Sequence, residues 1–195
     1  MAGTRLFVHQ DIFEQVITGI KVMAESFKIG HGLDPDKDFG PLISDTQRKR
    51  VMSYIQAGID EGAELITGGK IAGEKGFFIQ PTIFTQVHGD MKIAKEEIFG
   101  PVLCAQSFGD NDLETIAQQA NDTSYGLSGS VWTQDISVAH KMAMLIDAGQ
   151  VSINWHAAVD PAIPFGGNKQ SGWGREFGKE GLEPYLKTKA TSVIF

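Results

Sequence analysis

Cysteine is almost absent from this chain, since Cys104 is the only thiol among 195 residues. A single cysteine excludes an internal disulfide framework and any zinc or iron–sulfur site built from several thiolates, and it fits a reducing compartment. Long hydrophobic runs are missing too: none approaches the ~20 residues that cross a bilayer, and residues 1–8 lack the regions of a signal peptide. We therefore expect a soluble cytoplasmic protein that does not bind a membrane.

Positive charge is also scarce, because 17 Lys and Arg stand against 24 Asp and Glu, giving a formal net charge of −7. Such a balance argues against binding to a nucleic-acid backbone. The five histidines lie too far apart in the sequence for a metal site, and no glycine pattern matches a phosphate-binding loop or a dinucleotide fingerprint. We therefore expect no nucleic acid and no metal, and a free-standing nucleotide-binding domain is disfavoured.

What the chain does contain is an ordinary globular composition, with 42% hydrophobic and 21% charged residues. Its length is close to that of one domain. The 23 glycines against seven prolines indicate many turns and close backbone approaches. Disorder over the whole chain is excluded on this composition.

Hydrophobic periodicity predicts helices and short strands in the first half of the chain. Residues 6–8 are typical of a buried strand, and Asp11 with Glu14 has the spacing of a capping box for a helix that continues to residue 27. Ser44 has the position of a cap for a second helix, which continues to about residue 62. Short strands are expected at 64–67, 77–84 and 101–108.

Strands and helices then alternate along the chain. Strands are expected at 101–108, 128–133 and 150–155, with helices at 113–121 and 136–147. This alternation favours a parallel sheet covered by helices on both faces, a three-layer α/β domain. Residues 182–187 look helical, and residues 190–195 are predicted to form a terminal strand. That strand needs an edge to pair with, which another subunit can supply.

Two features near residue 100 are candidates for chemistry. Cys104 lies in an apolar strand, where burial raises the pKa of a thiol and favours a structural role over a nucleophilic one. Glu96 and Glu97 are adjacent, so their side chains diverge by about 100° in a helix. They form either a solvated charged surface or a site into which only one carboxylate points, at the strand end where α/β folds bind ligands.

A glycine-rich segment, residues 164–176, is a further candidate for a functional role. It contains two glycine pairs, aromatic residues at Phe165 and Trp173, and the charged pair Arg175 and Glu176. Two interpretations are open: a tight crossover whose glycines permit close packing, and a segment that lines a substrate site.

Six motifs, in order and at matching intervals over nearly the whole chain, resemble the C-terminal part of an NAD(P)-dependent aldehyde dehydrogenase. Residues 160–165 and 171–176 are most similar to phenylacetaldehyde dehydrogenases and related bacterial members. The resemblance implies a three-layer αβα catalytic domain with a mostly parallel sheet. The six motifs are AGTR at 2–5, FGPLI at 39–43, GFFIQPT at 76–82, EEIFGPV at 96–102, YGL at 125–127 and PFGG through GRE at 164–176.

The resemblance also implies a mechanism. In the family, a cysteine thiolate attacks the aldehyde, hydride passes from the thiohemiacetal to NAD or NADP, and the thioester is hydrolysed to a carboxylic acid. The family's nucleophile stands two residues before the motif at 2–5, a position that falls immediately before Met1. The general-base Glu, the oxyanion Asn and the dinucleotide domain also lie upstream. We therefore expect no catalytic residue in this chain, no cofactor bound by it alone and no activity of the isolated chain.

The remaining wall of the active site is expected in this chain. By resemblance, Glu97 hydrogen-bonds the nicotinamide ribose and Phe99 packs near the nicotinamide ring. Val159 and Phe165 line the channel for the aldehyde substrate, with residues 155–158, from Trp155 onward, close by. A Trp and a Phe there suit an apolar or aromatic aldehyde, although aromatic residues are also common in cores.

The resemblance divides the chain into residues 1–177, a catalytic domain without its nucleophile end, and residues 178–195, a helix and an oligomerisation strand. A homo-oligomer that assembles through the C-terminal strand is therefore expected. The alternative from another functional class is a noncatalytic module that associates with itself or with a partner.

Overall fold

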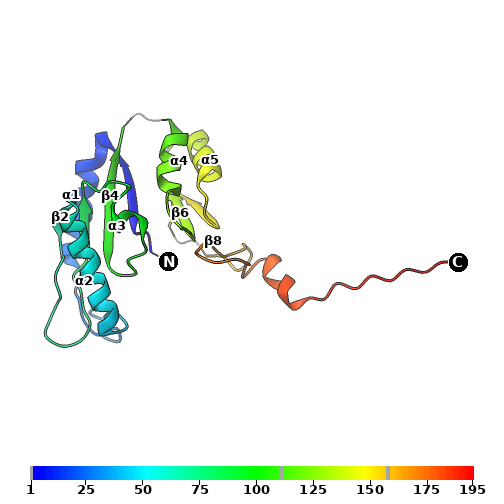
Figure 1. Ribbon diagram of the computed structural model, residues 1–195, viewed down its shortest axis with the longest axis horizontal. Helices are drawn as coiled ribbons and strands as arrows, with labels where there is room; N and C mark the ends of the chain where they lie inside the picture. The colour runs from blue at the N-terminus through cyan, green and yellow to red at the C-terminus, as the bar shows by residue number, and fades with distance from the viewer. Residues whose placement is uncertain (1, 110–111, 157–158) are drawn as a thin grey trace. The chain divides into compact units, whose positions relative to one another are not determined.

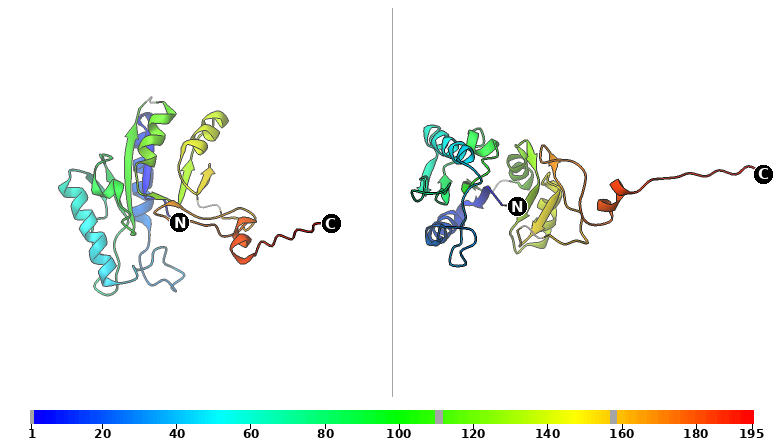
Figure 2. Two further views of the ribbon diagram at one scale, coloured as in Figure 1. Left: turned by 45° about the vertical axis from the view of Figure 1, so that its right-hand side comes forward. Right: turned by 90° about the horizontal axis from the view of Figure 1, so that it is seen from below.

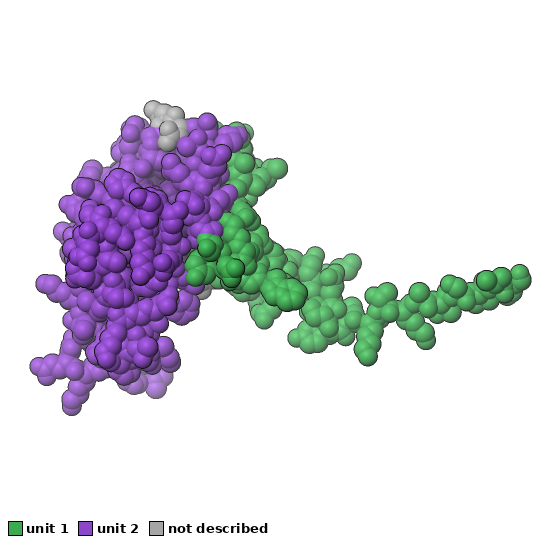
Figure 3. All heavy atoms as spheres, viewed as in Figure 1, with its two compact units in different colours: residues 1, 124–195 green, residues 2–123 purple. Residues whose placement is uncertain are grey.

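The computed structural model describes residues 2–109, 112–156 and 159–195. They form two compact units, residues 2–123 and residues 124–195, which Figure 3 distinguishes by colour. The division predicted from the sequence, at residues 177 and 178, is a different one and stays a prediction. No helix in the described part of the chain is long and apolar enough to cross a membrane.

The unit of residues 2–123 contains one mixed sheet. Its strand order is β1-β4-β3-β2, in which β1, β4 and β3 run parallel and β2 pairs antiparallel with β3. The predicted α/β class is confirmed, with a mixed sheet. The elements, labelled in Figure 1 where there is room, are β1 (Arg5–His9), α1 (Gln10–Ser26), α2 (Asp45–Asp60), β2 (Glu64–Thr67), β3 (Thr82–Thr85), α3 (Lys92–Lys95), β4 (Val102–Phe108) and α4 (Leu113–Asn121).

The core of this unit joins α2 and α3 to the sheet. Val51 and Ile55 of α2 meet Phe84 of β3 and Ile93 of α3 in one cluster of buried side chains. The cluster also includes Ile98, which lies between α3 and β4. Since burial of apolar surface is the main stabilising term in a fold, this cluster fixes the segment that precedes β4.

Local capping signals were right for α2 and wrong by two residues for α1. Ser44 caps α2, and its side chain accepts a hydrogen bond from the Gln47 N–H at 3.1 Å. The cap of α1 is His9, whose Nδ1 accepts from the Asp11 N–H at 3.4 Å. Asp11 itself lies in the first turn, where a carboxylate interacts favourably with the helix dipole.

The strand predicted at residues 77–84 is wrong in its first half, because β3 begins only at Thr82. Ile79 forms an isolated bridge with Ile71 instead of joining the sheet. Pro81, which has no N–H to donate to a ladder, separates this bridge from β3. The apolar pattern alone did not show where sheet pairing starts.

The unit of residues 124–195 contains two small sheets. β6 and β7 run parallel and are connected through α5, which confirms the predicted strand–helix–strand order, whereas β5 and β8 pair antiparallel. Among the described strands, β4 and β6 belong to different sheets, so the predicted three-layer arrangement stays a prediction. The elements are β5 (Tyr125–Gly126), β6 (Ser128–Val131), α5 (Ile136–Leu145), β7 (Gln150–Ile153) and β8 (Asn168–Lys169).

The C-terminal residues differ from the sequence prediction. Helical structure is present as a 3₁₀ helix, η1 (Glu180–Tyr185), which contains Pro184. Proline removes a backbone donor, which favours a short 3₁₀ segment over an α-helix. Residues 190–195 form no strand within the described chain, and Figures 1 and 2 show them as an extended segment. Pairing of this segment with a second subunit stays a prediction.

Candidate functional site

Glu97 and Phe99, the two residues predicted to contact the cofactor, lie in the loop that joins α3 to β4. Ile98 between them is only 2% exposed and belongs to the core cluster, whereas Phe99 is 71% exposed and Glu97 is also exposed. The buried side chain of Ile98 anchors the loop. The side chains of Glu97 and Phe99, on either side of Ile98, are therefore both at the surface of the protein.

Side chains of α2 hold this loop through its backbone. Gln47 Nε2 donates to the carbonyl oxygens of Ile98 at 3.2 Å and Phe99 at 3.0 Å, and Arg50 Nη2 donates to the carbonyl oxygen of Glu97 at 3.2 Å. Phe99 has a φ of 58°, which is uncommon for a residue with a side chain and costs about 1–3 kcal/mol. The three hydrogen bonds help to hold the loop in this conformation.

Gly100 brings the same loop close to α2. A Cβ atom at this position would lie 2.6 Å from a methyl group of Val51. Only glycine lets the backbone approach α2 this closely without a shift of the core. This explains the glycine in the motif that links Phe99 to β4.

The two adjacent carboxylates have different environments. Tyr54 is 5% exposed; its Oη donates to Glu96 Oε2 at 2.6 Å, and Arg50 Nη2 donates to the same hydroxyl at 3.1 Å. Within the described part of the chain, no side chain makes a hydrogen bond or an ion pair with the Glu97 carboxylate. Glu96 is therefore bound to α2, whereas the Glu97 carboxylate has no side-chain partner among the described residues.

Sequence reasoning missed Gln47, Arg50 and Tyr54. The apolar residues of α2 predicted the helix, but its polar face was not given a role. These three residues have the spacing i, i+3 and i+7, which places them on one face of a helix. That spacing is the only signal in the sequence, and it does not show which segment the face contacts.

Cys104 is buried in β4, as predicted. Its Sγ donates a weak hydrogen bond to the carbonyl oxygen of Ile93 at 3.4 Å. Burial raises the pKa of this thiol from 9.0 to about 12, with a smaller opposing effect of the Arg5 charge. At neutral pH the only thiol of the chain is therefore protonated and enclosed.

Trp155 and Val159, predicted to lie at the aldehyde channel, follow β7 and have exposed side chains. The loop is anchored on both sides of Trp155. The Asn154 side chain accepts from the Thr133 N–H at 3.0 Å and donates to the Thr133 carbonyl at 2.9 Å. His156 Nδ1 lies 2.6 Å from a hydroxyl oxygen on β6. Residues 157–158, also predicted near the channel, lie outside the described residues.

Phe165 is half-buried at the start of the glycine-rich segment. Its N–H and carbonyl pair with those of Glu176, both at 2.7 Å, and its ring centroid lies 6.4 Å from that of Phe177. A Cβ atom at Gly166 would lie 2.5 Å from the carbonyl oxygen of Gly174. The segment is therefore a tight crossover that requires its glycines, and this crossover sets the position of Phe165.

The five candidate residues divide between the two units. Glu97 and Phe99 share one loop in residues 2–123, whereas Trp155, Val159 and Phe165 belong to residues 124–195. Their roles toward cofactor and substrate stay predictions. Among the described residues, no group of three or more His, Cys, Asp or Glu side chains is arranged to hold a metal ion.

Comparison with known proteins decides the family. A family model described as "Aldehyde dehydrogenase family" matches residues 1–191. The chain belongs to the aldehyde dehydrogenase family. Two similar curated aldehyde dehydrogenases are the putative enzyme DhaS of Bacillus subtilis, 44% identical over 98% of this chain, and the phenylacetaldehyde dehydrogenase of Pseudomonas fluorescens, 41% identical over 100% of it.

Solved aldehyde dehydrogenases share the fold. The NAD⁺ complex of the Bacillus cereus enzyme matches with a TM-score of 0.91 and 45% identity over 95% of this chain. The chain spans 38% of that structure, and it spans 38% and 39% of the two curated aldehyde dehydrogenases. The predicted membership is confirmed, and the chain corresponds to a fragment of these relatives.

Proposed function

We propose that this chain forms one wall of the active site of an aldehyde dehydrogenase, and that the complete enzyme oxidises an aldehyde to a carboxylic acid with NAD or NADP. One observation carries the proposal: α2 fixes the loop backbone so that the side chains of Glu97 and Phe99 are exposed together. Family membership over residues 1–191 supports the reaction class.

The exposed residues of the loop fit a dinucleotide. Glu97 offers two carboxylate oxygens, and no side chain among the described residues competes for them, which suits the hydroxyls of a ribose. Phe99 offers an exposed aromatic ring against which a nicotinamide ring can pack. The cofactor, when bound, supplies the hydride acceptor. Glu97 would accept hydrogen bonds from the ribose, and Phe99 would restrict movement of the ring.

The aldehyde channel is proposed for Trp155, Val159 and Phe165. All three side chains are apolar, so they favour an apolar or aromatic aldehyde over a charged one. The hydrogen bonds of Asn154 and His156 on either side of Trp155 support a fixed position for that side chain. A relative named phenylacetaldehyde dehydrogenase, 41% identical, is consistent with this substrate class.

The isolated chain is proposed to be inactive and to contain no catalytic residue. The sequence holds one cysteine, and the pKa of its buried thiol is raised to about 12. A thiol in this state does not supply the thiolate that nucleophilic catalysis requires at neutral pH. The nucleophile, the general base and the dinucleotide domain would come from the remainder of the complete enzyme, so this chain alone is not expected to retain NAD or NADP.

Assembly of the complete protein is also proposed from the resemblance. Residues 1–177 would form part of a three-layer αβα catalytic domain in a cytoplasmic enzyme. Residues 178–195 would mediate homo-oligomerisation, with 190–195 as a strand on the neighbouring subunit. The exposed apolar side chains of Val193, Ile194 and Phe195 support an interface at this segment.

Complementation tests the activity. The chain is mixed with a separately produced N-terminal portion of a relative that contains its nucleophilic cysteine, and NADH formation is followed with phenylacetaldehyde. We expect no turnover above a heat-killed control for the chain alone and measurable turnover for the mixture. Turnover by the chain alone would contradict the proposal.

Cofactor binding tests the site separately from activity. In the complemented enzyme, Glu97→Gln is expected to weaken NAD binding in calorimetry about tenfold, the size of one lost hydrogen bond to a charged group. Glu14→Gln, which removes the same charge from an exposed position on α1, is the matched control. Equal affinity of the Glu97 variant and the control would exclude Glu97 from the cofactor site.

A noncatalytic self-associating or partner-binding module is the second candidate function. The exposed apolar residues of the C-terminal segment favour it, since such residues mark interaction sites. Self-assembly of the chain without any complementation would support this function over the enzymatic one.

A further inference from the structure

A serine and a histidine that are not among the candidate residues form a hydrogen bond next to Trp155. Ser130 belongs to β6 and His156 follows β7, and the distance from Ser130 Oγ to His156 Nδ1 is 2.6 Å. Both residues are half-buried, and both belong to residues 124–195. The Ser130–His156 pair therefore joins the segment after β7 to the neighbouring strand.

Ser130 is the one polar partner of the His156 ring among the described residues. The other ring nitrogen, Nε2, is buried and makes no hydrogen bond with a described residue. A buried polar atom without a partner is unfavourable, and loss of the remaining hydrogen bond would leave the whole ring in that state. The Ser130 hydroxyl therefore determines whether the imidazole keeps its buried position.

Asn154 anchors the same segment on the other side of Trp155. Its φ of 52° turns the chain sharply directly after β7. Its N–H donates to the Val131 carbonyl at 2.8 Å. Its side chain accepts from the Thr133 N–H at 3.0 Å and donates to the Thr133 carbonyl at 2.9 Å. The two residues that flank Trp155 are therefore both bound to β6 or to the turn that follows it.

Trp155 lies between these two anchors, and its side chain is 61% exposed. A large aromatic side chain on a fixed backbone binds a ligand at a low cost in conformational entropy. Stacked or edge-to-face contacts between two aromatic rings add to the free energy of apolar burial. A fixed indole therefore favours an aromatic substrate over a short aliphatic one, and a mobile indole loses part of that preference.

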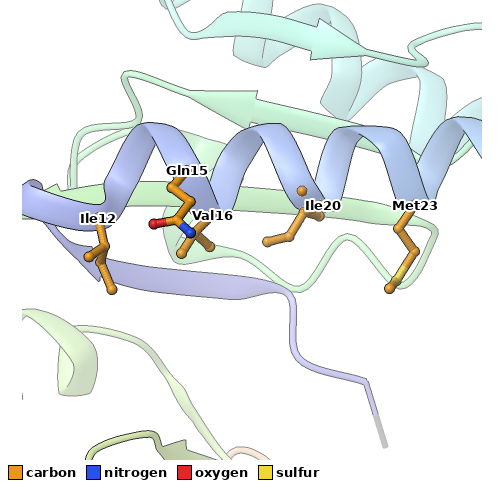
Figure 4. Close-up of a pocket in the computed structure, with 6 residues that line it drawn as sticks. Ile12, Gln15, Val16, Ile20 and Met23 are labelled. Atoms are coloured by element: carbon orange, nitrogen blue, oxygen red, sulfur yellow. The ribbon is translucent and has the colours of Figure 1, made fainter.

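The apolar groove on α1 offers no comparable surface. It belongs to residues 2–123, and the described residues that line it include no aromatic side chain and neither member of the pair. Figure 4 shows its labelled side chains along the helix, namely Ile12, Gln15, Val16, Ile20 and Met23. Of these two surfaces, only the one at Trp155 can stack against an aromatic ring.

We propose that Ser130 and His156 are positioning residues for aldehyde selection: their hydrogen bond fixes the backbone at Trp155, and the fixed indole favours an aromatic aldehyde over a short aliphatic one. The inference rests on the proposed function, which assigns Trp155 to the aldehyde channel. Neither member of the pair touches the reacting atoms. Variants of the pair should therefore change KM and leave kcat nearly unchanged.

Fluorescence of Trp155 tests the anchor in the chain alone. The chain has three tryptophans, and Trp132→Phe with Trp173→Phe, at two largely exposed positions, leaves Trp155 as the only one. In this background, Ser130→Ala is expected to increase about twofold the part of the time-resolved anisotropy that is lost through local motion. Ser128→Ala is the control, because Ser128 is a half-buried serine of the same strand, and it should leave the decay unchanged. An unchanged decay in Ser130→Ala would overturn the proposal.

Substitutions of His156 separate the hydrogen bond from the packing of the ring. His156→Asn keeps a hydrogen-bonding atom near the position of Nδ1, whereas His156→Leu keeps an apolar side chain without any polar atom. We expect the Asn variant to retain the slow anisotropy decay of Trp155 and the Leu variant to lose it. A decay that is equal in the two variants, or faster in the Asn variant, would overturn the proposal, because the hydrogen bond would then not hold the segment.

Kinetics of the complemented enzyme test the selectivity. Ser130→Ala is expected to raise KM for phenylacetaldehyde about fivefold, the size of one lost aromatic contact. KM for acetaldehyde, and kcat for both aldehydes, should change by less than about twofold. Ser128→Ala should keep the values of the unmodified mixture. Equal increases of KM for both aldehydes, or a fall in kcat alone, would overturn the proposal.

The outcomes separate this inference from the proposed function. If the unmodified mixture forms no NADH, the enzymatic function is rejected, and the role of the pair in aldehyde selection is rejected with it. If the mixture forms NADH and Ser130→Ala leaves both KM values unchanged, the function is retained and the inference is rejected.

Discussion

Single side chains decide what the acidic pair of the loop can do. Tyr54 is 5% exposed and binds one of two adjacent carboxylates, Glu96, at 2.6 Å. Arg50 joins this hydroxyl to the carbonyl of Glu97 through one guanidinium group. The positions of Glu96 and of the Glu97 backbone therefore depend on two residues of α2, Arg50 and Tyr54.

Removal of the Tyr54 hydroxyl should loosen the loop. Tyr54→Phe is expected to lower the free energy of unfolding by about 1–2 kcal/mol, since a hydrogen bond to a charged group is lost at a buried position. Amide exchange at Ile98 and Phe99 should accelerate with it. Tyr185→Phe, at an exposed tyrosine, is the control and should change neither quantity. Equal effects of the two variants would contradict a positioning role for Tyr54.

The buried thiol predicts a specific pH dependence. Burial raises the pKa of Cys104 from 9.0 to about 12 in the folded chain. Stability due to the protonated thiol is therefore complete below pH 9 and declines as the pH rises from 9 toward 12, by up to about 1.4 kcal/mol per pH unit. Urea unfolding of the chain and of Cys104→Val across this range measures the difference in slope.

A chemical probe provides the control for that experiment. A thiol reagent should leave Cys104 unmodified in the folded chain at pH 7 and modify it fully in urea. Rapid modification of the folded chain, or identical pH slopes for the two proteins, would show that the thiol is not enclosed as the structure indicates.

At the scale of the elements, two glycines of residues 2–123 have opposite roles, one inside a helix and one directly after a strand. Gly19 lies inside α1, where an added Cβ would meet nothing within 4 Å apart from its chain neighbours and the backbone of the helix itself. Gly68 follows β2 with a φ of 79°, and an added Cβ would lie 2.1 Å from the carbonyl oxygen of Pro81. Position 19 can therefore accept a side chain, whereas the turn that leads toward β3 requires a glycine at position 68.

The same substitution at these two positions should therefore have opposite signs. Gly19→Ala is expected to raise the free energy of unfolding by about 0.5–1 kcal/mol through helix propensity. Gly68→Ala should lower it by about 2 kcal/mol or more, because a left-handed φ and a clash with backbone combine. Urea unfolding measures both, and changes of the same sign would contradict the packing described for one of them.

For the whole molecule, the C-terminal segment should control assembly. Residues 190–195 belong to no sheet of the described chain and expose Val193, Ile194 and Phe195. Deletion of residues 190–195 is expected to convert an oligomer to a monomer in light scattering and to leave circular dichroism unchanged. An unchanged mass would show that this segment does not form the predicted intersubunit strand.

Much of the fold was predictable where the signal is local. The predicted helix at 113–121 has the bounds of α4, and Ser44 caps α2 as its spacing indicates. The cap at His9 and the start of β3 at Thr82 were missed. A histidine cap is weakly marked in sequence, and the start of a strand depends on pairing with residues far along the chain.

The sequence by itself determined the α/β class, the aldehyde dehydrogenase family and the presence of a single thiol, because composition, periodicity and ordered motifs are properties of the chain. Only the tertiary structure decided which of Glu96 and Glu97 is bound to α2. Tyr54 and Glu96 are 42 positions apart in sequence. Contacts over such separations form only when packing brings the elements together, so no local pattern encodes them.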